Sequence, residues 1–249
     1  MRLATTTAVL ALCAAGAQAQ ITGESHSYTI DGTEFEGYVA RNSDLEESRG
    51  TVLIVHDWDG LTDYERRRAD MLAAAGYTAF AIDVYGADTD PQGMEDYQRL
   101  SGEMYQDRET FRARLLGAVE EAGSIEGAPA EMVMIGYCFG GAAVLEAARA
   151  GAETQGFVSF HGGLGTPEGQ TWEAATGPIQ FYHGTADPVS GPDALAATLT
   201  ELQEAGIDHE AQIFGGARHS FTVWGSDDYM LEADTESWDG LLDFLDATF

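Results

Sequence analysis

The stretch MIGYCFGGAAVLEAARAG, residues 134–151, decides the fold. A short apolar run ends in GYCFG (136–140), and an alanine-rich helical pattern follows at once. A cysteine held as G-x-C-x-G between a strand and a helix matches the tight turn called a nucleophile elbow, with cysteine in place of serine. Glycines are needed there because larger side chains would collide with the neighbouring strand and helix. The pattern predicts that Cys138 is a nucleophile at the end of a buried strand.

Strands and helices alternate outward from this stretch. Apolar runs predict strands at residues 51–56, 78–84, 132–137, 157–161, 179–183 and 210–214, and helical patterns cover residues 62–76, 92–106, 107–123, 139–150, 191–206 and a closing segment around 238–245. Residues 25–40 alternate around Asp31-Gly32, which predicts a hairpin. Such alternation is typical of an α/β fold with a mostly parallel sheet. We expect residues 20–249 to form a single domain of this class.

Two polar residues follow later strands in the order that a catalytic triad requires. Asp187 lies in HGTADP (183–188), and His219 lies in GGARHSF (215–221). Each alone is an ordinary loop residue, but nucleophile, acid and histidine in this order predict a triad of Cys138, Asp187 and His219. The helix after Cys138 points its positive end at the sulfur, which favours a thiolate. Its first N–H, that of Phe139, is a candidate oxyanion donor.

These motifs resemble the dienelactone hydrolase family of the α/β-hydrolase fold over residues 28–249. The resemblance implies a mostly parallel central sheet with helices on both faces. It also implies Cys138 as nucleophile, His219 as base and Asp187 as the group that orients the base. The expected reaction is therefore hydrolysis of small esters or lactones through an acyl-thioester intermediate.

The loop VHDWDG (55–60) is implied by the same resemblance to lie over the active site. The resemblance also implies that the Trp58 N–H is the second oxyanion donor. Asp57 stands where the family carries a glutamate that contacts the resting cysteine, and it is one methylene shorter. Tyr85 is a further candidate for the pocket wall, as are other aromatic residues near predicted strand ends.

The substrate-binding arginines of the family are absent from this chain. Val223, four residues after His219, and Gly86, just past a strand end, occupy the positions where the resemblance implies arginines. A neutral ester or lactone is therefore expected rather than a carboxylated ring. Arg218 and the run Arg66–Arg68 are alternatives for the missing cations, although three consecutive arginines on a helix favour a solvated face.

Three histidines other than His219 lie near the predicted strand ends. We expect His56 and His161 to make structural hydrogen bonds, with a place in the pocket wall as the alternative. His183 is expected to brace the loop that carries Asp187.

Composition excludes several classes of partner. All 12 cations are arginines, there are 42 acidic residues, and the net charge is −30. Such a chain is repelled by nucleic-acid phosphates and anionic lipids, so no nucleic acid and no membrane is expected. No D-x-D-x-D-G loop or His/Cys ligand cluster indicates a metal site. We expect no cofactor, a small-molecule substrate and a monomer.

The first residues have the pattern of a secretory signal. Arg2 is followed by an apolar segment (8–15) and by Ala-Gln-Ala (17–19), which predicts a signal peptide of residues 1–19 cleaved before Gln20. The protein is therefore expected to be periplasmic or secreted. Cleavage removes Cys13 and leaves Cys138 as the single cysteine.

Two readings other than a hydrolase stay open at this stage. A single thiol in an oxidising compartment fits a redox or peroxide-reactive protein that cycles through sulfenic acid, although no resolving cysteine is present. A catalytically silent binding module on the same fold is the second alternative.

Overall fold

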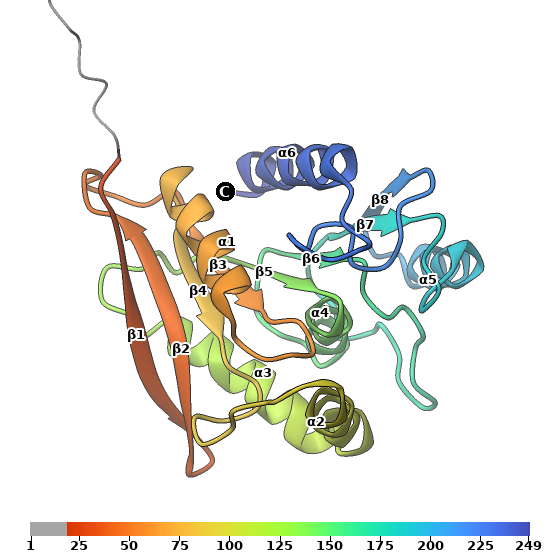
Figure 1. Ribbon diagram of the computed structural model, residues 1–249, viewed down its shortest axis with the longest axis horizontal. Coiled ribbons are helices and arrows are strands. Elements are labelled where there is room, and N and C mark those ends of the chain that lie inside the picture. Colours follow the sequence, from red (N-terminus) through yellow and green to blue (C-terminus); the bar gives the residue numbers. More distant parts are fainter. Residues whose placement is uncertain (1–18) are drawn as a thin grey trace, which may run out of the picture.

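The computed structural model describes residues 19–249 (Figure 1), so the predicted signal peptide lies outside the described residues, apart from Ala19. The strands are β1 (Ile21–Ile30), β2 (Thr33–Asn42), β3 (Thr51–Val55), β4 (Thr78–Ile82), β5 (Met132–Tyr137), β6 (Gly156–Phe160), β7 (Ile179–Gly184) and β8 (His209–Phe214). The helices are α1 (Asp63–Ala74), α2 (Met94–Gln106), α3 (Arg108–Ala122), α4 (Phe139–Arg149), α5 (Pro192–Ala205) and α6 (Leu231–Thr248). Within these residues, no helix has the length and apolar character needed to cross a membrane.

The strands form one sheet in the order β1-β2-β4-β3-β5-β6-β7-β8. The predicted hairpin of β1 and β2 pairs antiparallel to β4, and every pair from β4 to β8 is parallel. The prediction of a mostly parallel sheet is therefore confirmed. Since parallel strands end at the same edge, the loops after β3, β5, β6, β7 and β8 meet there.

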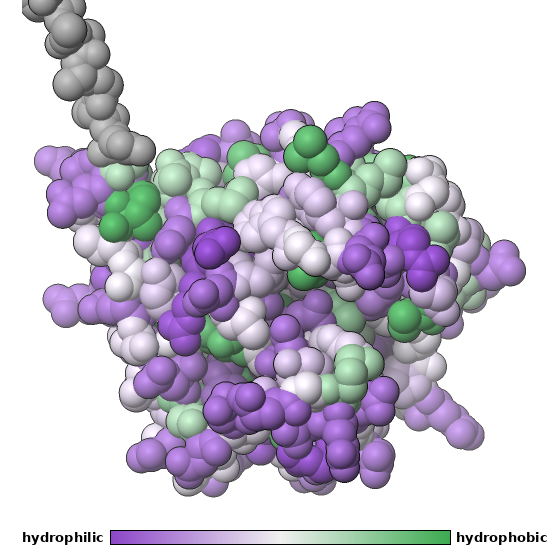
Figure 2. Space-filling view, viewed as in Figure 1, coloured by the Kyte–Doolittle hydropathy of each residue, from purple (hydrophilic) through white to green (hydrophobic). Residues whose placement is uncertain are grey.

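Helices cover both faces of the sheet, as expected. In β3, Val52 and Ile54 join the hydrophobic cluster under α1 and α6, while Leu53 and Val55 join the cluster under α3, α4 and α5. This alternation buries β3 on both faces, which explains its continuous apolar sequence. On the face that Figure 2 shows, hydrophilic residues cover much of the surface, and the most hydrophobic residues are few.

The prediction of a solvated face for the run of three arginines is wrong for its last member. Arg68 is only 1% exposed, and its guanidinium donates hydrogen bonds to the carboxylate of Asp234 and, at 3.0 Å, to the carbonyl of Thr222. The guanidinium carbon lies 4.3 Å from the ring centre of Trp224 and 5.3 Å from that of Trp238. Arg68 is buried because it stands on the face of α1 that α6 and the loop before it cover.

Candidate active site

The elbow after β5 has the strained geometry that its glycines predict. Cys138 has a φ of 52°, which lies in the left-handed region that residues other than glycine rarely adopt. A Cβ on Gly136 would lie 2.2 Å from the carbonyl oxygen of Gly140, and one on Gly140 would lie 2.1 Å from that of Val55. Backbone atoms cannot give way at such distances, so both positions need glycine.

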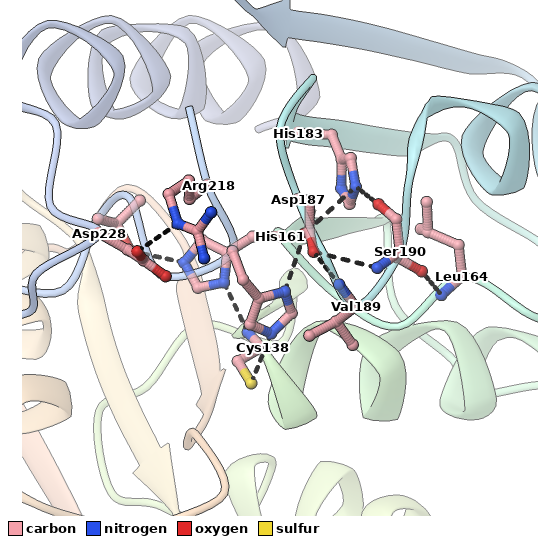
Figure 3. A network of polar contacts seen from close by, with 11 residues as sticks. Cys138, His161, Leu164, His183, Asp187, Val189, Ser190, Arg218 and Asp228 are labelled. Atoms are coloured by element: carbon pink, nitrogen blue, oxygen red, sulfur yellow. Dashed lines mark hydrogen bonds and ion pairs between the residues drawn. The ribbon is translucent and has the colours of Figure 1, made fainter. Parts of the chain in front are cut away.

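The three side chains predicted as a triad lie in contact, and Figure 3 labels two of them, Cys138 and Asp187. The distance from Cys138 Sγ to His219 Nε2 is 2.9 Å, and His219 Nδ1 lies 2.8 Å from Asp187 Oδ2. Cys138 follows β5, Asp187 follows β7 and His219 follows β8, so the three come from neighbouring strand ends of the same edge. Asp187 Oδ1 accepts hydrogen bonds from the N–H groups of Val189, at 2.7 Å, and Ser190, at 3.0 Å.

The Asp187 carboxylate is held in its charged form. Burial acts to raise the pKa of Asp187, but the hydrogen bonds from His219 and from the two backbone N–H groups keep this pKa below its ordinary value. A charged acceptor fixes the proton of His219 on Nδ1, which leaves Nε2 free to take a proton from the thiol. His183 braces this loop: its Nε2 donates to the carbonyl of Ser190 at 2.6 Å.

The position of α4 favours a thiolate, whereas burial and a nearby carboxylate favour the neutral thiol. Burial, followed by the negative charge of Asp57, raises the pKa of Cys138 well above its ordinary value, and the hydrogen bond from the Phe139 N–H only partly offsets this. Despite its short side chain, Asp57 lies close enough to the thiol for its charge to act on the pKa of Cys138. Burial and the nearby Asp59 raise the pKa of Asp57 to about 6. Burial and the nearby carboxylate together outweigh the effect of the helix end on this pKa.

Replacement of Asp57 by asparagine removes this charge and keeps an oxygen atom in its place. We expect iodoacetamide to alkylate Cys138 about fivefold faster at pH 7.5, because the thiol then ionises more readily. In the wild type, protonation of Asp57 removes the same charge, so the difference should shrink as the pH falls below about 6. Alkylation rates measured by mass spectrometry between pH 5 and 9 test this, with Asp63→Asn as an exposed control. Equal rates at every pH would show that the Asp57 charge does not hold the thiol neutral.

One of the two N–H groups predicted for the oxyanion hole, that of Trp58, is hydrogen-bonded in this state. The Trp58 N–H donates to Asp57 Oδ1 at 2.5 Å. A substrate carbonyl oxygen would have to displace the Asp57 carboxylate to use the second donor.

Three side chains hold the loop after β3, and sequence patterns gave two of them, Tyr85 and Glu65, no such role. His56 Nδ1 donates to the carbonyl of Asp57 at 2.5 Å, so this histidine is structural. Tyr85 donates to the carbonyl of Trp58 at 3.0 Å and braces the loop from behind. Glu65, which caps α1, also accepts the Asp57 N–H at 3.2 Å. Burial raises the pKa of Glu65 to about 8.

A cavity of about 270 Å³ opens on the thiol. Its lining residues are Trp58, Ser101, Tyr105, Cys138, Phe139, Gly163, Val189, His219 and Ser220. Sequence reasoning missed Tyr105, in the last turn of α2, and Val189, because neither belongs to a motif or follows a strand directly. No arginine lines this cavity, which therefore suits an uncharged ligand.

The remaining candidates for the pocket wall lie elsewhere. Val223 is half-buried outside the cavity. Tyr85 and Gly86 line a separate hollow of about 410 Å³. Arg218 does not replace the missing cations, because its Nε is paired with Asp228 Oδ1 at 2.6 Å on the surface. Among residues 19–249, no group of three or more His, Cys, Asp or Glu side chains is arranged to hold a metal ion.

Comparison with known proteins agrees with this architecture. The crystal structure of the dienelactone hydrolase-like promiscuous phosphotriesterase P91, from metagenomic libraries, superposes with a TM-score of 0.86 at 27% identity, over 92% of this chain and 99% of P91. A Bradyrhizobium sp. protein named "Probable 2-oxo-3-(5-oxofuran-2-ylidene)propanoate lactonase" is 27% identical, over 78% of this chain and 82% of its own length. An acylaminoacyl peptidase of Pyrococcus horikoshii shares the fold, with a TM-score of 0.71 at 14% identity, over 92% of this chain and 42% of the peptidase.

A family model matches most of the chain. The model described as "Dienelactone hydrolase family" matches residues 35–249, which include the elbow and the segments carrying Asp187 and His219. With its eight-stranded sheet and helices on both faces, the chain is an ester-bond hydrolase of the α/β-hydrolase fold and belongs to the dienelactone hydrolase family.

Proposed function

We propose that this protein is an exported hydrolase of small, uncharged esters or lactones that acts through Cys138, His219 and Asp187. The observation that carries the proposal is the 2.9 Å contact between Cys138 Sγ and His219 Nε2, with the Asp187 carboxylate on the far side of the imidazole. A thiol, a base that can take its proton and a group that orients the base together form an activated nucleophile.

The reaction follows from these positions. His219 Nε2 takes the proton of the thiol as the sulfur attacks the ester carbonyl carbon, and the N–H groups of Phe139 and Trp58 stabilise the oxyanion. The imidazolium then returns the proton to the leaving alkoxide, and an acyl-thioester stays on Cys138. A water molecule gives its proton to His219, attacks the thioester and releases the acid, after which the thiol regains its proton. Asp57 leaves the Trp58 N–H when the carbonyl oxygen arrives.

The cavity supports small neutral substrates. Its volume of about 270 Å³ lies below the usual range for drug-sized ligands, roughly 300–1,000 Å³. Its wall includes Trp58, Tyr105 and Phe139, which offer apolar and aromatic surface and no positive charge. A short acyl chain or a small lactone ring fits such a site better than a carboxylated ring. The lactonase named among the relatives supports the lactone part of the proposal.

Acyl chain length tests this proposal. We expect kcat/KM for p-nitrophenyl butyrate to exceed that for the octanoate by about tenfold, because the longer chain does not fit the cavity. A panel of p-nitrophenyl acetate, butyrate, hexanoate and octanoate, with γ-butyrolactone beside it, gives the comparison. A rise in kcat/KM with every added methylene would contradict it, and absence of turnover with every substrate would favour the binding-module alternative.

Neutral phosphotriesters form a second candidate substrate class. An uncharged, aromatic cavity suits a neutral triester as well as a neutral ester, and the phosphotriesterase P91 has the same fold at 27% identity. Cys138 would attack phosphorus in place of carbon and release the aryl oxide. Release of p-nitrophenol from paraoxon by the wild type, with a phosphoryl adduct on Cys138, tests this class.

The redox alternative is less well supported by the site. A peroxide-reactive cysteine needs an accessible thiolate, whereas burial and Asp57 raise the pKa of Cys138. A dimedone adduct on Cys138 after mild peroxide treatment would favour the redox alternative.

Export is proposed from the pattern of residues 1–19 alone. Intact-mass measurement of protein isolated from the periplasm or the medium tests this proposal, and the expected mass is that of a chain that begins at Gln20.

A further inference from the structure

His161 is a buried histidine that the proposed mechanism does not use. It follows β6 directly, has no exposed surface and lies beside Cys138 (Figure 3). Its φ of 39° lies in the left-handed region. Strain of this kind persists only where surrounding contacts hold the residue in place, and it is concentrated at functional sites.

One side of the His161 ring holds the nucleophile elbow. The backbone N–H of Cys138 donates to His161 Nδ1 at 3.2 Å and shares this hydrogen with the carbonyl of Phe160 at 3.0 Å. Cys138 itself has a positive φ of 52°. Two strained residues on adjacent strand ends therefore hold each other in place.

The other side of the ring holds the loop of the base. His161 Nε2 lies 2.8 Å from Thr222 Oγ1, and Thr222 stands three residues after His219 in the same loop. Thr222 Oγ1 is also hydrogen-bonded to the hydroxyl of Tyr64 at 2.7 Å. The rings of His161 and His219 pack edge to face with centres 5.4 Å apart. A single imidazole thus joins the backbone of Cys138 to the segment that carries His219.

These contacts require one protonation state. Because Nδ1 accepts from the Cys138 N–H, the single proton of a neutral ring is on Nε2 and is donated to Thr222. The titratable and charged groups around the ring are His219 from the loop after β8, His183 from β7, Tyr64 and Arg68 from α1, and Tyr137 from β5. Burial, and then the proximity of His219, His183 and Arg68, lowers the pKa of His161 well below its ordinary value. The neutral tautomer is therefore the stable one.

We propose that His161 is a positioning residue, whose imidazole sets the contact between Cys138 Sγ and His219 Nε2 by bonding to the Cys138 N–H and to Thr222 Oγ1. The inference rests on the proposed role of Cys138 as the nucleophile. A displacement of about 1 Å between reacting groups lowers rates by up to about 100-fold, so a residue that fixes this distance acts on kcat.

Substitution of His161 tests the proposal with a conservative rescue. We expect His161→Leu to lower kcat about 30-fold with KM changed less than about twofold, because the cavity wall does not include His161. His161→Asn offers a carboxamide oxygen to the Cys138 N–H but is too short to reach Thr222, and it should recover kcat to within about tenfold of the wild type. His209→Leu, on β8, is the matched control and should keep the wild-type kcat.

Both variants should fold, because the Cys138 N–H keeps its bond to Phe160 and Thr222 keeps its bond to Tyr64. Thermal unfolding checks this. The proposal is overturned if His161→Leu keeps the wild-type kcat, or if His161→Asn falls as low as His161→Leu. If His161→Leu does not fold, Thr222→Val decides: an expected fall in kcat of about tenfold that Thr222→Ser restores supports the proposal, and an unchanged kcat overturns it.

A double-mutant cycle separates positioning from independent packing. If both residues act through the same contact, His161→Leu with Thr222→Val should lower kcat no more than about twofold beyond His161→Leu alone. If the fold-changes in kcat caused by His161→Leu and Thr222→Val multiply in the double variant, the proposal is overturned. Turnover by Cys138→Ala separates failure of the proposed function from failure of the role of His161. If Cys138→Ala is active, the proposed function fails. If Cys138→Ala is inactive and His161→Leu is fully active, only the role of His161 is overturned.

Discussion

Cys138→Ala is expected to lower kcat/KM for p-nitrophenyl butyrate by at least about 10³-fold. The reason is chemical: without the sulfur no acyl-thioester forms, and His219 is left with water as the only nucleophile. The free energy of unfolding should change by less than about 1 kcal/mol, because alanine keeps the Cβ and backbone of the elbow. Initial rates and thermal unfolding of the same preparations give both values.

Cys138→Ser provides the matched comparison for this prediction. It keeps the shape of the elbow and the hydrogen bond to His219, but a serine hydroxyl is a weaker nucleophile in a site built for a thiol. We expect residual activity about 10²-fold below the wild type, with an acyl adduct detectable by mass spectrometry after acid quench. Equal turnover by the wild type and Cys138→Ala would place the nucleophile elsewhere.

Asp234→Ala is expected to lower the free energy of unfolding by about 3–5 kcal/mol. Asp234 is 6% exposed and accepts hydrogen bonds from Arg68, Trp224 and Tyr229. Its removal leaves the buried guanidinium of Arg68 without a counter-charge, and burial of an unpaired charge is among the costliest changes in a protein interior. Urea denaturation followed by tryptophan fluorescence measures the effect.

The surface pair of Arg49 and Asp246 is the control, with side chains 48% and 53% exposed. Asp246→Ala should lower the free energy of unfolding far less than Asp234→Ala, because solvent screens the pair. The double variant Arg68→Met/Asp234→Leu should recover most of the loss, since it leaves no charge unpaired. A loss below about 1 kcal/mol for Asp234→Ala would mean that solvent reaches Arg68.

Much of the fold follows from local sequence patterns. The apolar runs of β3 and β5 have the length and continuity of strands buried on both faces, and the capping box of Thr62 and Glu65 marks the start of α1. The elbow can also be predicted from the sequence, because Gly136 and Gly140 stand at positions where the tight turn leaves no room for a Cβ. These features depend on neighbours in sequence, so a single chain reveals them.

Features that depend on contacts between distant segments could not be predicted from the sequence. Arg68 looks like its exposed neighbour Arg67, and only the docking of α6 and Asp234 makes its burial possible. The charge state of Cys138 depends on Asp57, which approaches from the loop after β3. Tyr105 enters the cavity from α2, and no local signal indicates this. In each case the decisive contact joins segments many residues apart.

The origin of Tyr105 has a consequence for how specificity can diverge. Cys138, Asp187 and His219 stand on strand-end loops, whereas Tyr105 reaches the cavity from a helix that carries none of them. Substitutions in α2 can therefore reshape the acyl site while the reacting atoms keep their places. Laboratory evolution towards bulkier substrates can therefore start with substitutions in α2. Natural relatives can have diverged in specificity through changes in the same helix.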